Sequence, residues 1–137
     1  MTGMGRSLPK GKMILLPYKA SIYYGMPALV KNTDTHEILE QITSDFERMK
    51  EKYQVIGEVR GLGSMIGLEF VKDRETKEPA PEMVKEIINS CFEEGIILIN
   101  AGLLGNVIRF LPPLVMTIEQ AEYGMDVLDK EISKIAK

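Results

Sequence analysis

The sequence changes character near residue 33, and this change limits where regular structure can form. The first 33 of its 137 residues hold three prolines and four glycines, which interrupt any long helix. From residue 34 onward, apolar residues recur at helical and strand intervals. We therefore divide the chain into an arm, residues 1–33, and a domain of regular structure, residues 34–137.

The same boundary separates two regions of opposite charge. The arm carries five basic residues and no acidic one, whereas the domain carries all 20 acidic residues against 12 basic ones. Five positive charges in front of a domain of charge −8 argue against nucleic acid as a partner. The arm also lacks the apolar core of a secretory signal and the amphipathic helix of a transit peptide. We expect it to be loop and short extended structure that packs on another part of the protein.

The counts of cysteine and histidine exclude two further classes. A single cysteine, Cys91, cannot build a disulfide framework, and a single histidine, His36, leaves no His/Cys zinc cluster. No apolar run approaches the roughly 18–20 residues that cross a bilayer. These observations predict a cytoplasmic protein that has neither a metal site nor a membrane span.

The domain is predicted to run helix, strand, helix, strand, strand, helix. The predicted strands are 65–71, 96–99 and 107–111, and the predicted helices are 34–52, one from Pro81 up to Gly95, and one from Thr117 to the end. Only residues 100–106 separate the last two strands, which favours an antiparallel pair. The expected fold class is α+β with two layers: a small, mostly antiparallel sheet of about three strands covered by helices.

Helix caps support these boundaries. Asp34 with Glu37, and Thr117 with Gln120, each have the spacing of a capping box. Gly95 lies where a left-handed residue would end the second helix.

Two features that resemble functional motifs are better explained by structure. Gly61 and Gly63 permit a positive φ angle or a close backbone approach, and a strand follows them instead of the lysine or helix of a phosphate loop. Cys91 lies on the apolar face of the second helix with no histidine near it in sequence, so we interpret it as a packing residue.

Arg109 is the residue of the domain whose position suggests chemistry. It lies in the middle of the apolar strand 107–111. Strand alternation alone could turn it to solvent. An arginine on a rigid strand can also bind a carboxylate through two parallel charge-assisted hydrogen bonds. The spacing leaves both interpretations open.

Three segments of the domain resemble one enzyme family. Residues 56–70 (Ile-Gly-Glu-Val-Arg-Gly-Leu-Gly-Ser-Met-Ile-Gly-Leu-Glu-Phe), 94–99 and 106–114 are similar, in order, to the C-terminal small domain of class III pyridoxal-phosphate aminotransferases. The resemblance covers roughly residues 34–137, is strongest to 4-aminobutyrate aminotransferases, and implies the small-domain fold of fold-type I enzymes. In this family the arginine of the Asn-Val-(Ile/Leu)-Arg stretch helps to bind the substrate's carboxylate. That role falls on Arg109.

The arm resembles the family only in pieces, which implies a remnant of the large domain. Residues 2–6 are similar to the stretch that follows the aspartate paired with the cofactor's pyridine nitrogen, and residues 21–27 weakly resemble the family's Gly-Thr-(Tyr/Phe)-Gly-Gly-Asn-Pro motif. Ile22 replaces the threonine that binds the cofactor's phosphate from the neighbouring subunit. None of the arm's lysines lies in the family's Schiff-base motif: Lys10, Lys12, Lys19.

The resemblance implies pyridoxal phosphate as the family's cofactor, yet we assign no catalytic, cofactor-binding or metal-binding residue to this chain. Transamination needs a lysine, an acid beside the ring nitrogen and a phosphate cup. We therefore expect a small-domain fragment that is not catalytic alone and holds no cofactor alone, which leaves its status as an enzyme open.

Two alternatives stay open: a subunit that completes a split aminotransferase, and a recycled, self-assembling binding module. Isolation would expose an apolar face, so we expect a homodimer or a separately encoded large domain as the partner.

Overall fold

The computed structural model describes residues 33–113 and 115–136, with side chains from residue 37 onward. Residues 1–32 of the predicted arm, their packing and the side chain of Asp34 lie outside this description. The described elements are α4 (Thr33–Lys52), β1 (Ile56–Leu62), β2 (Met65–Phe70), α5 (Pro81–Glu93), β3 (Ile99–Ala101), β4 (Val107–Phe110) and α6 (Ile118–Ile135). Among these helices, none is long and apolar enough to cross a membrane.

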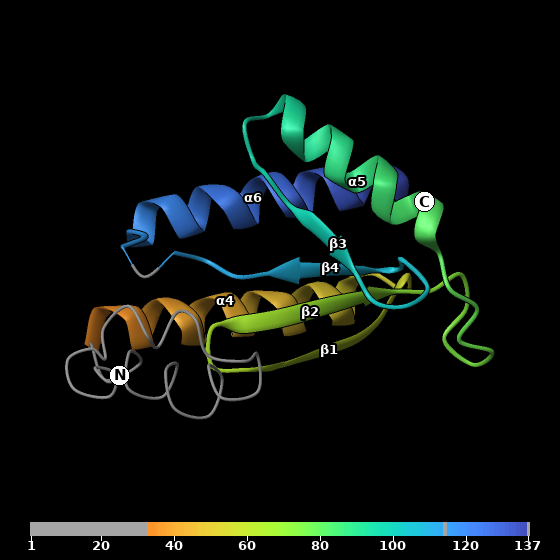
Figure 1. Cartoon of the computed structure of the whole chain (residues 1–137), viewed down its shortest axis with the longest axis horizontal. Coiled ribbons are helices and arrows are strands. Elements are labelled where there is room, and N and C mark those ends of the chain that lie inside the picture. The colour runs from red at the N-terminus through yellow and green to blue at the C-terminus, as the bar shows by residue number, and fades with distance from the viewer. Residues whose placement is uncertain (1–32, 114, 137) are drawn as a thin grey trace, which may run out of the picture.

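The four strands form one antiparallel sheet in the order β1-β2-β4-β3. Alternate residues of β2 are buried and join a single core with the apolar stripes of α4, α5 and α6. In Figure 1, β2 and β3 cross in front of α4 and α6, as expected for a sheet with helices on one face. The predicted two-layer α+β class is therefore confirmed.

The centre of the core joins α4 to the middle of the sheet. Ile42, Phe46 and Met49 recur at helical spacing on α4 and are almost fully buried. The ring of Phe46 meets that of Phe110 on β4 edge-on, with centroids 5.3 Å apart and planes at 84°. Such a pair stabilises the fold by about 0.5–1.5 kcal/mol beyond the apolar area that it buries. This contact fixes the strand that carries Arg109.

The predicted caps at the ends of α5 and α6 are confirmed. Thr117 and Gln120 form the reciprocal capping box. The backbone N–H of Gln120 donates to the Thr117 hydroxyl at 3.2 Å, and the backbone N–H of Thr117 donates to the side-chain oxygen of Gln120, Oε1, at 3.0 Å. Gly95 has a φ angle of 87°, and its amide donates to the Phe92 carbonyl at 3.0 Å. Pro81 is the first residue of α5.

Two predictions about the strands need correction. The sheet has a fourth strand, β1, where no strand was predicted, because only Ile56 of its seven residues is fully buried and alternation is weak. The predicted strand 96–99 is wrong in position, since β3 covers Ile99–Ala101. The backbone N–H of Ile96 donates to the Cys91 carbonyl at 2.8 Å, so Ile96 is still hydrogen-bonded to the last turn of α5 and does not begin a strand. The predicted antiparallel pairing of the last two strands is confirmed.

The glycine pair shapes the turn between β1 and β2. A Cβ atom on Gly61 would lie 2.3 Å from the Met65 carbonyl oxygen, and Gly63 has a φ angle of 61°. A close approach and a positive φ are both required, as the structural interpretation of these glycines predicted.

Arg74 ties the loop after β2 to the end of α4. Its guanidinium donates to the carbonyls of Lys50 and Tyr53, which belong to the last turn of α4 and the residue after it, and to that of Ile56. Carbonyls at a helix C-terminus have no partner within the helix, and a cation there also interacts favourably with the helix dipole. Arg74 therefore fixes the junction from which β1 begins.

Candidate functional site

The face of the sheet opposite the helices carries two arginines in one cross-strand row. Arg60 on β1 and Arg109 on β4 both pair with Gly67 on β2, one from each side. Ile99 on β3 pairs with Arg109 and completes the row. Because glycine has no side chain, the row has a gap between the two guanidinium groups.

A hollow of about 440 Å³ occupies this gap, and we call it the Gly67 hollow. Its lining combines the two arginines with apolar side chains and includes Leu62, Met65, Ala101 and Val107. A small concave surface with a few charged groups among apolar ones is the usual form of a small-molecule site.

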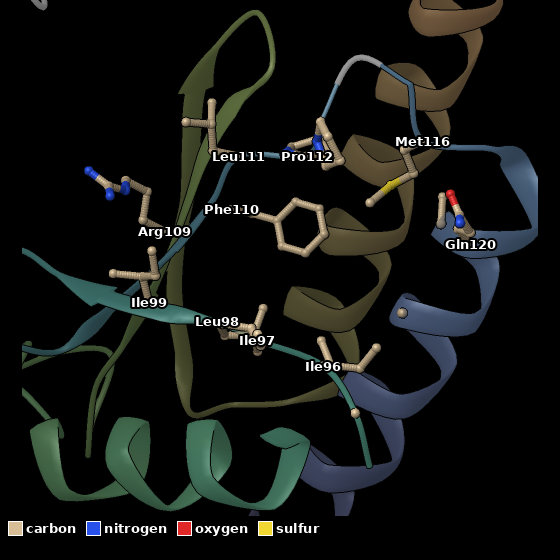
Figure 2. Close-up of a pocket in the computed structure, with 14 residues that line it drawn as sticks. Ile96, Ile97, Leu98, Ile99, Arg109, Phe110, Leu111, Pro112, Met116 and Gln120 are labelled. Atoms are coloured by element: carbon tan, nitrogen blue, oxygen red, sulfur yellow. The ribbon is translucent and has the colours of Figure 1, made fainter. Parts of the chain in front are cut away.

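A second hollow, of about 330 Å³, lies at the end of β4, is also lined by Arg109, and is here called the Phe110 hollow. It is bounded by the chain from Gly95 to Ile99, by the end of β4 and by the first turns of α6. Figure 2 shows Phe110 projecting into this space and Arg109 projecting from β4 to the opposite side. Strand alternation explains the difference, because successive side chains point to opposite faces.

The side chain of Arg109 is exposed, as alternation allowed. Within the described residues, it makes no hydrogen bond or ion pair. Its guanidinium therefore keeps the donor pairs that a carboxylate can accept. Both interpretations of its position hold geometrically: it is turned to solvent, and it projects from a rigid central strand.

Arg60, in contrast, is held by two acids. Its Nη1 lies 2.8 Å from Glu58 Oε2 and 2.7 Å from Glu69 Oε2. The hydrogen bond from Arg60 lowers the pKa of the Glu69 carboxyl, and the same bond raises the pKa of Arg60. Glu69 therefore stays ionised at neutral pH.

Residues 25–132 match the family model described as aminotransferase class-III. This chain belongs to the class III aminotransferase family. It is 45% identical over 96 residues to an alanine/serine racemase from Pyrococcus horikoshii, covering 70% of this chain and 20% of the racemase. It is 37% identical over 94 residues to a 4-aminobutyrate aminotransferase from Mycobacterium leprae, covering 69% of this chain and 21% of the aminotransferase.

A solved structure supports the same assignment. An adenosylmethionine-8-amino-7-oxononanoate aminotransferase from Methanocaldococcus jannaschii superposes with a TM-score of 0.67 at 30% identity, over 84% of this chain and 26% of the other. This class III aminotransferase chain spans about a fifth of the length of the curated relatives it matches. The relatives differ in their named reactions, which include racemisation as well as transamination.

The family depends on pyridoxal phosphate, and the described part of this class III chain does not fit that cofactor. The linings of the two hollows contain no lysine. Several lysines of the domain instead form surface ion pairs, for example Lys52 with Asp129 and Lys130 with Glu94. No group of three potential metal ligands occurs among the described residues either. We therefore derive no step through the cofactor.

Cys91 is buried in the core, in agreement with its interpretation as a packing residue. Burial, with a smaller contribution from the Glu131 carboxylate, raises the pKa of its thiol to about 11. A thiol that stays protonated is a poor nucleophile.

Sequence reasoning named Arg109 as a candidate, which stays a prediction, and it did not name the acids and the arginine around it. Glu58, Arg60 and Glu69 alternate with less polar residues on β1 and β2, which is the signal of one shared face. That signal depends on recognising β1 as a strand and on its register with β2.

Proposed function

We propose that this chain is the small domain of a class III aminotransferase-type enzyme and that Arg109 binds the carboxylate of its substrate. One observation carries the proposal: Arg109 is exposed beside the Gly67 hollow, on a central strand, with its guanidinium unpaired among the described residues. A planar guanidinium on a rigid strand is suited to bidentate binding of a carboxylate.

We propose further that turnover needs a large domain, from elsewhere in a longer chain or from a separate protein. The chain covers about a fifth of its relatives' length, and neither hollow is lined by a lysine. Pyridoxal phosphate, when bound by the rest of the enzyme, supplies the electron sink for amino-group chemistry. The task of this chain is to orient the substrate.

The open sheet face supports such a partner. Leu62 and Ile99 on this face are each about half exposed, at 50% and 52%. Apolar side chains gathered beside a hollow are typical of a surface that another domain covers. A split enzyme and a self-assembling module are the alternatives, and they predict a separate protein or a second copy of this chain on the same face.

For the substrate we propose an amino acid of the 4-aminobutyrate type. The support is the identity of 37% with the aminotransferase from Mycobacterium leprae together with a site suited to a carboxylate. A location in the cytoplasm stays a prediction from the use of cysteine.

The test is a titration of the 137-residue chain with glutarate, monitored through the NMR signal of the Arg109 Nε–H group. We expect this signal to move and the backbone signals around Gly67 to follow. Arg109→Ala should abolish the backbone response, and Arg109→Lys should weaken it, because a lysine cannot bind in a bidentate manner. Arg48→Ala is the matched control, since it removes an exposed arginine on α4. An unchanged response in Arg109→Ala would reject the proposal.

A further inference from the structure

One carboxylate on the open face lies within reach of both arginines. Glu69 is two residues from Gly67 on β2 and therefore points to the same face. Its cross-strand partners are Glu58 on β1 and Val107 on β4. Arg60 and Arg109 are thus its diagonal neighbours on the two flanking strands. Diagonal neighbours lie about 7–8 Å apart, which long side chains can span.

The structure shows which arginine holds this carboxylate. Oε2 of Glu69 lies 2.7 Å from Arg60, and Oε1 lies 3.4 Å from Asn106 Nδ2. Asn106 is buried and anchored, because its Nδ2 also donates to the Phe70 carbonyl at 2.9 Å. Arg60 is steadied in turn by Glu58. Both oxygens of Glu69 therefore have partners other than Arg109.

We propose that Arg60 is a positioning residue for carboxylate recognition: it holds Glu69, together with Asn106, and so keeps Arg109 open for the substrate. This inference rests on the proposed function of Arg109. An internal carboxylate released beside Arg109 would compete with any ligand at a high effective concentration. Without Arg60, two cations remain near Glu69: its diagonal neighbour Arg109 on β4, and Lys77, whose charge also lowers the pKa of Glu69.

Other charged groups near Glu69 must be controlled for in any experiment that follows its titration. From β1 it is faced by Arg60 and Glu58, from the residue before β4 by the neutral Asn106, from β4 by its diagonal neighbour Arg109, and from the loop after β2 by the charge of Lys77. Glu58 is a second carboxylate bound to Arg60, so the loss of Arg60 frees it together with Glu69. A variant of Glu58 is therefore needed to assign any titration that reaches Arg109.

The first experiment needs no ligand. The Arg109 Nε–H signal of the complete chain is followed from pH 3 to pH 7. In the wild type we expect it to be independent of Glu69. In Arg60→Gln it should follow one titration, because ionised Glu69 then pairs with Arg109. Adding Glu69→Gln should remove that titration, whereas adding Glu58→Gln should leave it in place.

The second experiment measures glutarate affinity in the same variants. Arg60→Gln should weaken binding by up to about five-fold, the range expected of a competing surface ion pair. Arg60→Gln with Glu69→Gln should restore the wild-type affinity, and so should Arg60→Lys, which keeps a cation on Glu69. A general loss of structure would not be rescued by changing Glu69. The Arg60 side chain is half exposed, so we expect these variants to fold.

Two results separate the inference from the proposed function. If the Arg109 Nε–H signal in Arg60→Gln does not change as Glu69 ionises, the proposed role of Arg60 is wrong. A signal that follows Glu69, combined with no glutarate binding in any variant, would confirm that Arg60 holds Glu69 but reject Arg109 as the carboxylate site.

Discussion

At the scale of single residues, burial and the neighbouring charges decide the chemistry that each side chain can perform. Cys91 is buried among apolar residues, whereas Arg109 is exposed on a strand of the same core. Burial favours the neutral thiol over the charged thiolate. The same burial makes the Cys91 thiol a poor nucleophile, whereas exposure leaves the donors of Arg109 accessible to a ligand.

The raised pKa of Cys91 predicts slow chemistry at alkaline pH. With a pKa of about 11 against the 9.0 of an unperturbed thiol, the native thiol forms far less thiolate near pH 8 than the unfolded one. We expect a thiol reagent to react about a hundred-fold more slowly with the native chain than in denaturant. The same shift stabilises the fold fully below pH 9, and this contribution is lost as the pH rises from 9 through 11.

The control for this prediction moves the thiol along the same helix. Cys91→Ala combined with Asn89→Cys places a thiol at an exposed position of α5, where it should react as fast as in denaturant. Equal native and denatured rates for Cys91 itself would contradict the buried position described above.

At the scale of elements, two glycines illustrate opposite local demands. A Cβ atom on Gly61 would lie 2.3 Å from a backbone oxygen and 2.9 Å from the Ile66 Cα atom, whereas one on Gly124 in α6 meets nothing within 4 Å. Glycine within a helix costs about 0.5–1 kcal/mol relative to alanine. One position therefore requires glycine, and the other only tolerates it.

Alanine substitutions should consequently shift stability in opposite directions. We expect Gly124→Ala to raise the free energy of unfolding by about 0.5–1 kcal/mol. Gly61→Ala should lower it by more than that and broaden the NMR signals of the turn between β1 and β2. Urea denaturation of both variants against the wild type measures the effect. A stabilised Gly61→Ala variant would show that the two strands do not approach as described.

The elements also show how far the sequence predicts the fold. The three helices are well predicted because their apolar stripes, Pro81, Gly95 and the Thr117 capping box act locally. β1 was missed because its burial comes from β2 and α4, which the local pattern does not contain. Arg109 was predicted as a site residue from its sequence motif, whereas the contacts of Glu69 depend on the register of three strands. Such contacts are tertiary and leave no short-range pattern.

At the scale of the whole molecule, the described domain is one core with one covered and one open face. The three helices cover one side of the sheet, and the other side carries the Gly67 hollow with an arginine on each flank. The charge of the domain, −8, makes a site built from arginines a local exception in an acidic protein. A carboxylate would therefore be held by these specific groups and not by the overall field.

The proposed role of this domain is to supply, through Arg109, the carboxylate site of a class III enzyme. The most direct measurement is kcat/KM for an amino acid in a chimera of the Pyrococcus horikoshii racemase whose matching segment is replaced by residues 34–137 of this chain. We predict that the chimera turns over its substrate. Arg109→Ala should lower kcat/KM by about ten- to hundred-fold, because it removes a charged hydrogen-bonded pair. Arg48→Ala should leave kcat/KM unchanged. An active chimera whose kcat/KM is the same with and without Arg109 would contradict the account.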